Sequence, residues 1–135
     1  MQLVQSVVKY AQDKKAEDIR ILDMRSVANF CDYFVICTGT SDRQVKAIAD
    51  GIDQGLDEIG IAIRYKQGLK GAIQQFGEGA IGSWALLDMG NVVVHVFEPD
   101  AREFYNLEYL WRDALEIPLT AVAKKPRVLR KKSSS

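Results

Sequence analysis

One histidine and a few scattered carboxylates are the residues of this sequence whose types could support catalysis. His95 is the single histidine, and a zinc site needs three or four nitrogen or sulfur ligands. Asp88 could pair with His95, but the spacing identifies no serine or cysteine as a nucleophile for such a pair. Asp88 and Asn91 fall short of the two carboxylates of a magnesium-dependent transferase, although Asp23 and Asp32 could supply others through the fold. The pattern counts against an enzyme without excluding one, and we expect no metal or cofactor.

The turn Thr38–Arg43 is a second candidate for chemistry. A glycine turn that enters a helix can bind an anion through free backbone N–H groups and the helix dipole. The P-loop lysine and the GxGxxG spacing are both missing here, and Asp42 would repel a phosphate. Ser41 and Gln44 instead stand at the spacing of a capping box. We therefore favour helix capping over anion binding.

Aromatic and acidic residues gather in the last third of the chain. Trp84 begins a short predicted strand, and Asp88 ends it. Tyr105, Glu108 and Tyr109 are three and four residues apart, so on a helix they share one face. Tyrosine and tryptophan beside charges are typical anchors of protein interfaces. The pattern fits equally well with rings that only complete the core.

Hydrophobic periodicity predicts the elements that must position these side chains. It indicates helices over residues 2–14, 41–59 and 99–114, and strands over 18–24, 33–38, 61–65, 83–89 and 91–97. A tight turn at residues 89–91 predicts a hairpin, and the five glycines of residues 67–82 predict a mobile surface loop. The apolar side of the last helix would carry Phe104, Leu107, Leu110, Trp111 and Leu115. This order predicts the α/β class, with a mixed sheet of about five strands flanked by helices.

Length and charge indicate one domain followed by a basic tail. The 135 residues suffice for one core, so we expect a domain over 1–117 and a disordered tail over 118–135. Residues 1–120 hold all 18 acidic residues but only 12 of the 18 basic ones, giving −6, and residues 121–135 carry +6. An acidic body argues against wrapping nucleic acid and suits a basic protein partner, although ordinary solubility explains it as well. RNA contact would be restricted to the tail.

The same composition predicts a cytoplasmic location. Cys31 and Cys37 form no CxxC pair, which favours a reducing compartment. No apolar run approaches the roughly 18 residues of a membrane span, so we expect no membrane contact. The first twenty residues lack the pattern of a signal or transit peptide.

Two blocks of sequence resemble the ribosomal silencing factor family, also called RsfS or Iojap. They are CDYFVICTGTSDRQVKAIAD at residues 31–50 and SWALLDMGNVVVHVFEPDAREFYNLEYLW at residues 83–111. Within them the family pattern matches Asp32, Gly39, Ser41, Arg43 and Asp50, then Trp84, Asp88, Gly90 and His95, then Arg102, Tyr105, Glu108 and Trp111. The resemblance covers residues 1–115 and leaves out the tail.

The resemblance implies a translational repressor rather than an enzyme. Such a protein binds the large ribosomal subunit through ribosomal protein L fourteen and blocks joining of the small subunit. Relatives in organelles assist large-subunit assembly. The implied fold is a nucleotidyltransferase-like α/β sandwich that forms a homodimer, which makes a nucleotide-binding transferase the alternative function. On this basis the expected partner-binding residues are Trp84, Leu86, Asp88, Met89, Tyr105, Glu108 and Tyr109.

Two positions depart from the family pattern. Gln67–Gly68 stands where the family has Glu-Gly, and Gly90–Asn91 replaces the usual Gly-Asp turn. Each departure removes a negative charge near the expected docking edge. We expect them to affect the strength of partner binding rather than the identity of the partner.

Overall fold

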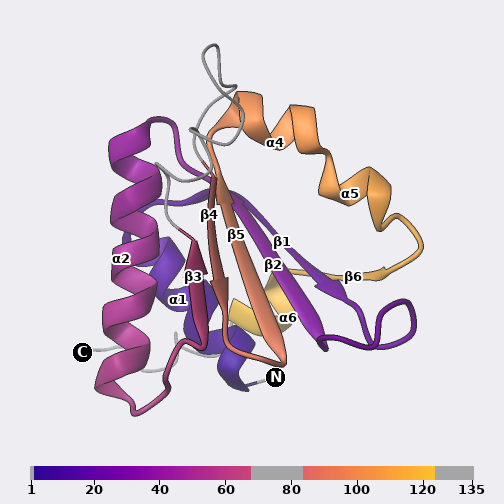
Figure 1. The fold of residues 1–135 in the computed structure, drawn as a ribbon, viewed down its shortest axis with the longest axis horizontal. Helices are drawn as coiled ribbons and strands as arrows, with labels where there is room; N and C mark the ends of the chain where they lie inside the picture. The colour runs from indigo at the N-terminus through magenta and orange to yellow at the C-terminus, as the bar shows by residue number, and fades with distance from the viewer. Residues whose placement is uncertain (1, 68–83, 124–135) are drawn as a thin grey trace.

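A six-stranded mixed sheet is the centre of the part that the computed structural model describes, residues 2–67 and 84–123 (Figure 1). Its strands lie in the order β3-β4-β5-β2-β1-β6, with β2 parallel to β5 and the other pairs antiparallel. The bounds are β1 (Glu17–Asp23), β2 (Tyr33–Thr38), β3 (Tyr65–Gln67), β4 (Trp84–Asp88), β5 (Val92–Phe97) and β6 (Leu115–Ile117). This confirms the predicted α/β class, with one strand more than the five that the periodicity indicates.

The central strands β2 and β5 are buried along their whole length. Their uninterrupted β-branched and aromatic residues leave no polar side for solvent, which is the pattern of strands covered on both faces. Their side chains alternate between two hydrophobic clusters, one on each face of the sheet. The two faces are covered in different ways, and this difference creates the candidate site.

Helices α1 (Gln2–Asp13) and α2 (Asp42–Glu58) cover one face of the sheet, and α2 stands at the left of the view in Figure 1. Each contributes one apolar stripe: Val4, Val7, Val8 and Ala11 from α1, and Val45, Ile48, Ile52 and Leu56 from α2. Gly55 allows the two helices to approach closely, because a Cβ there would lie 2.7 Å from ring atoms of Tyr10. This layer forms the larger of the two clusters.

The turn before α2 acts as a helix cap, as we expected. The Ser41 hydroxyl accepts from the backbone N–H of Gln44 at 3.1 Å. The Gln44 side-chain oxygen accepts from the backbone N–H of Thr40 at 2.7 Å, one residue earlier than in a standard capping box. The Gln44 amide nitrogen also donates to the carbonyl of Lys15 at 3.0 Å, which ties the turn to the end of α1.

The last predicted helix is broken in two, which corrects the expectation of one helix to residue 114. Helix α4 (Pro99–Tyr105) ends at Asn106, and α5 (Leu107–Leu110) begins directly after it. Asn106 has φ 46°, a left-handed conformation that asparagine tolerates better than most residues. Its side chain then accepts from the N–H of Tyr109 at 3.3 Å and caps α5. In Figure 1 the two helices arch over one end of the sheet.

Two further segments differ from the prediction. Strand β3 starts at Tyr65 rather than residue 61, because Ile61 and Ile63 pack against the core without pairing in the sheet. The first residues of the predicted tail also differ from the prediction, since Leu119 packs against the core and Thr120–Ala123 forms α6. The glycine-rich loop 67–82, apart from Gln67 in β3, and tail residues 124–135 lie outside the described residues.

Substitution along α2 tests this layer. Ile52 is fully buried, so Ile52→Ala should lower the free energy of unfolding by about 2–5 kcal/mol through lost transfer energy and a cavity. Ile59, at the end of the same helix, is 49% exposed, so Ile59→Ala should change it by less than about 0.5 kcal/mol. Urea unfolding of both variants measures the difference. Equal losses would contradict the assigned helix face.

Candidate partner-docking surface

Strand β4 sends its side chains alternately to the two faces of the sheet. Ala85 and Leu87 are buried against α1 and α2. Trp84 and Leu86 point to the opposite face, where they pack half-buried on the second cluster. Asp88 follows at the same period and is also half-buried. The strand therefore presents an indole, a leucine and a carboxylate in a row on the face away from α1 and α2.

Trp84 belongs to a cluster of rings. Its ring centroid lies 4.7 Å from that of Tyr105, 5.3 Å from that of Phe97 and 5.9 Å from that of His95. The indole Nε1–H donates to His95 Nδ1 at 3.2 Å. Tyr105 comes from α4, so the corner after β5 brings two predicted site residues together that are far apart in the sequence. Burial raises the pKa of the Tyr105 hydroxyl above its usual range.

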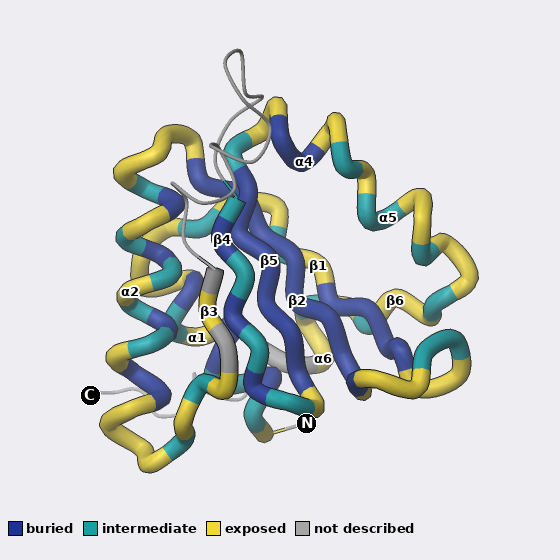
Figure 2. Tube along the Cα trace, in the orientation of Figure 1, coloured by how far each residue is buried: buried dark blue, intermediate teal, exposed yellow. Residues whose placement is uncertain are grey.

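The cluster continues across β5 and β2. Phe34 meets His95 edge-on at 4.8 Å and Trp111 at 6.0 Å. We call this surface the aromatic face: the half-buried Trp84, Leu86, Tyr105, Leu107 and Trp111, over the buried Phe34, His95 and Phe97. Figure 2 shows half-buried stretches on β4 and on α4–α5 beside the buried β5 and β2.

Arg102 holds the corner that carries Tyr105. It is buried on α4, and its guanidinium donates to the Asp18 carbonyl at 2.8 Å and to the Thr38 hydroxyl at 2.7 Å. It also donates twice to one oxygen of Glu108, at 2.9 and 2.5 Å. These bonds join α4 to β1, β2 and α5. Glu108, one of the expected partner-binding residues, is therefore an internal counter-ion of Arg102.

The remaining predicted site residues lie at different depths. Met89 is 8% exposed and packs on the side of α1 and α2, so the structure separates it from Trp84. Asp88 accepts from the N–H of Gly90 at 2.7 Å and closes the hairpin turn. Tyr109 is exposed on α5, and the Arg112 guanidinium lies 4.4 Å from its ring centre. The structure thus brings together Trp84, Leu86 and Tyr105.

Exposed apolar residues around α5 and β6 were missed by the periodicity. Phe104, Leu110 and Leu115 are 63–68% exposed, although we assigned them to the buried side of one helix. The helical spacing does not continue through the left-handed Asn106, so residues on either side of it do not share a face. A signal for the break was the asparagine itself, a residue that favours caps.

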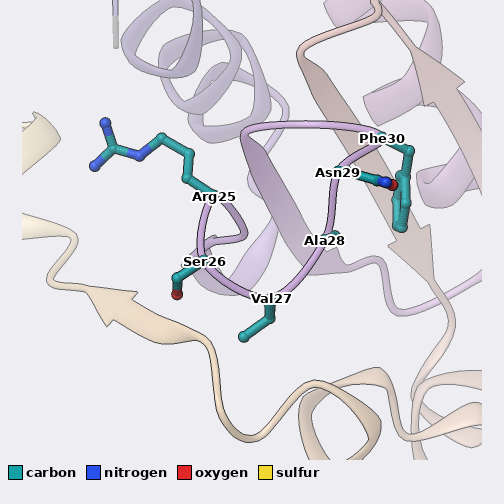
Figure 3. A pocket seen from close by; sticks show the side chains of 6 residues that line it. All are labelled: Arg25, Ser26, Val27, Ala28, Asn29 and Phe30. Carbon is teal, nitrogen blue, oxygen red and sulfur yellow. The ribbon is translucent and has the colours of Figure 1, made fainter.

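The β1–β2 loop adds one more ring to this region. Phe30 contacts both Phe34 and Trp111, with centroids 6.2 and 6.0 Å away, and is more than half exposed. Figure 3 shows Phe30 on one side of the shallow hollow that residues 25–30 line, with Arg25 directed away on the other side. Arg25 donates to Asp23 at 2.9 and 2.7 Å, and this pairing lowers the pKa of the Asp23 carboxyl.

Burial keeps the two thiols and the histidine ring of the described residues uncharged. Burial raises the pKa of Cys31 to about 11 and that of Cys37 to about 12, so both stay thiols. Burial lowers the pKa of His95 to about 3, so its ring is neutral. Among residues 2–67 and 84–123, no group of three or more His, Cys, Asp or Glu side chains could hold a metal ion.

Comparison with known proteins decides the family. The sequence model of the family described as "Ribosomal silencing factor during starvation" matches residues 1–135. The chain belongs to this family. RsfS of Bacillus subtilis is 46% identical over 113 residues, which cover 81% of this chain and 87% of that protein. The chloroplastic Iojap protein of Zea mays is 40% identical over 114 residues, 84% of this chain and 45% of that protein.

Two solved structures share the fold. An X-ray crystal structure of a Chromobacterium violaceum protein matches with a TM-score of 0.70 and 32% identity, covering 82% of this chain and 84% of that one. A Bacillus halodurans crystal structure matches with a TM-score of 0.69 and 40% identity, covering 87% and 98%. The predicted resemblance is confirmed, and the relatives carry the name of a regulatory factor. No helix in the described ranges is long and apolar enough to span a bilayer.

Removing the Arg102 guanidinium should weaken this RsfS-type fold. Arg102→Met deletes four hydrogen bonds and leaves Glu108 without its counter-ion, so we expect a loss of about 3 kcal/mol in the free energy of unfolding. Arg20→Met is the matched control. Arg20 pairs with Asp18 and Glu116 at the surface, where such pairs contribute about 0.5 kcal/mol. Chemical denaturation measures both, and comparable losses would contradict the assigned role of Arg102.

Burial of neutral His95 predicts a pH-dependent stability. Between about pH 3 and pH 6.5 the unfolded chain binds a proton at His95 that the folded chain does not. The free energy of unfolding should therefore fall with falling pH, relative to a His95→Phe variant, by about 1.4 kcal/mol per pH unit. Above pH 6.5 the difference should be constant. Parallel profiles of unfolding free energy for the two proteins between about pH 3 and pH 6.5 would show that His95 titrates normally.

Proposed function

We propose that this chain is a translational repressor that docks its aromatic face onto the large ribosomal subunit. The contact is ribosomal protein L fourteen, and the bound protein blocks joining of the small subunit. The observation that carries the proposal is the half-buried Trp84, packed beside Leu86 and Tyr105 on the sheet face that α1 and α2 leave uncovered. The silencing named in its relatives supports the ribosome as the target.

A ring held in this way is suited to anchor a partner. The stacked Phe97 ring and the tilted Tyr105 ring already restrict the indole, so docking costs little further side-chain entropy. Burying the rest of a large aromatic side chain contributes up to about 3 kcal/mol. Leu86, half-buried next to Trp84 on β4, extends the apolar contact. The rigid cluster therefore supplies affinity without a change in the fold.

The negative net charge of residues 1–120 supports a basic partner. Residues 1–120 carry the net charge of −6, and Asp88 lies in the row that Trp84 begins. Opposite charge on the two partners raises the association rate and penalises wrong partners, more than it raises affinity. Since Glu108 already neutralises Arg102, the other carboxylates of the acidic body supply most of this attraction. Binding should weaken as salt concentration rises.

The repression needs no chemical step. A protein of 15.1 kDa bound at the joining surface excludes the other subunit by occupying the space that this subunit requires. We propose the cytoplasm as the place of action, and a role in large-subunit assembly as a further consequence of the same binding. The homodimer implied by the resemblance stays a prediction, which sedimentation equilibrium of the purified chain tests directly.

Truncating the anchor should weaken docking. Trp84→Ala should reduce the affinity for isolated large subunits roughly 30-fold, which corresponds to about 2 kcal/mol for a central aromatic anchor. Ile59→Ala is the control, because Ile59 is half-exposed at the end of α2, away from the aromatic face. Co-sedimentation with separated large and small subunits measures both variants at equal protein concentration.

The outcomes of this experiment separate the functions. Unchanged sedimentation of Trp84→Ala with large subunits would remove Trp84 from the contact. Absence of binding by the unaltered protein, together with nucleotide-dependent thermal stabilisation, would favour the transferase alternative. Equal binding to both subunits would point to a general attraction for ribosomal RNA through the basic tail.

A further inference from the structure

His95 is a polar residue at a position that suits an apolar one. It stands in β5 among valines, with Val94 and Val96 as neighbours in the chain. Across the sheet it pairs with Ile36 of β2 and Leu86 of β4, and it is 5% exposed. A phenylalanine or leucine would fill this position without burying a polar ring.

The histidine makes one hydrogen bond and leaves a second polar atom unsatisfied. Nδ1 accepts from the indole of Trp84, so in the neutral ring the proton is on Nε2. Nε2 is buried and is the one buried side-chain nitrogen or oxygen of the described residues without a hydrogen-bond partner. Such an atom destabilises the fold. The unsatisfied Nε2 therefore lowers the stability of the fold, and the one hydrogen bond that His95 makes is the bond that Nδ1 accepts from Trp84.

We propose that His95 is a positioning residue that fixes the indole of Trp84 in its docking orientation. This inference rests on the proposed function of Trp84 as the anchor. Contact with the stacked Phe97 ring and the tilted Tyr105 ring restricts the plane of the indole but tolerates sliding and rotation within that plane. The bond from Nε1 to Nδ1 is directional, so it selects which edge of the indole faces the sheet. The opposite edge is then presented to the partner in one orientation.

A double-mutant cycle tests the bond. His95→Phe keeps an aromatic ring in the cluster and removes the acceptor, whereas Trp84→Phe keeps a ring and removes the donor. His95→Phe should weaken binding to isolated large subunits about three- to tenfold, the range expected for one hydrogen bond. In the Trp84→Phe background the same substitution should cause no further loss, because the bond is already absent.

A second variant guards against failure to fold. His95→Asn can place an amide oxygen near the position of Nδ1, so it should restore binding to within about twofold of the unaltered protein. Thermal melting of each variant establishes that it is folded. The indole N–H of Trp84 gives an independent readout: its hydrogen exchange, followed by NMR, should be at least about tenfold faster in His95→Phe than in the unaltered protein.

The results distinguish this inference from the function on which it rests. If His95→Phe lowered the affinity for large subunits by the same factor in the unaltered protein and in the Trp84→Phe variant, the positioning role would be overturned and the docking function would stand. Unchanged exchange of the indole N–H would also overturn it. Failure of the unaltered protein to bind large subunits would overturn the proposed function and this inference together. The role of His95 is established if His95→Phe weakens binding only when Trp84 is present and also speeds the exchange of the indole N–H.

Discussion

The buried guanidinium of Arg102 is the interaction on which the arrangement of the molecule depends. It joins α4 to a carbonyl of β1, a hydroxyl of β2 and a carboxylate of α5. A buried cation is tolerated only when its donors are satisfied, so these partners determine where α4 ends and where α5 begins. The left-handed Asn106 makes the required turn between them. Tyr105 is thereby placed against Trp84, and the aromatic face forms from elements that are far apart in the sequence.

Under the proposed function, one face of the sheet supplies stability and the other supplies recognition. The face under α1 and α2 is a continuous apolar layer of fully buried side chains. The opposite face is closed by large rings that are only half-buried, with a histidine whose burial is incompletely compensated. Surfaces that retain exposed aromatic area beside polar groups are typical of binding sites, and a less than optimal local stability often accompanies them. Under the proposed function, the half-buried rings of this second face are the surface that contacts the partner.

Local patterns were enough to predict much of the fold, and long-range contacts account for what they missed. The apolar runs of β2 and β5, the cap at Ser41 and Gln44, and the alternation of Trp84 and Leu86 are all local. The same alternation, applied one step further, assigns Met89 to the core side with Ala85 and Leu87. Two of the three partners of Arg102, Thr38 and Asp18, are 64 and 84 residues away along the chain, so no spacing rule could identify them. The exposure of Leu110 and Leu115 follows instead from the break at Asn106, for which the asparagine itself was a local signal.

Subunit joining in the presence of the protein tests the central claim most directly. Purified large subunits are first saturated with the protein, small subunits are added, and joining is followed by light scattering while the bound fraction is measured on the same sample. If the docked domain acts by occupying space, the fraction of joined particles should fall in direct proportion to the fraction of large subunits that carry it. Complete ribosomes that form at the normal extent and still contain the bound protein would contradict the account.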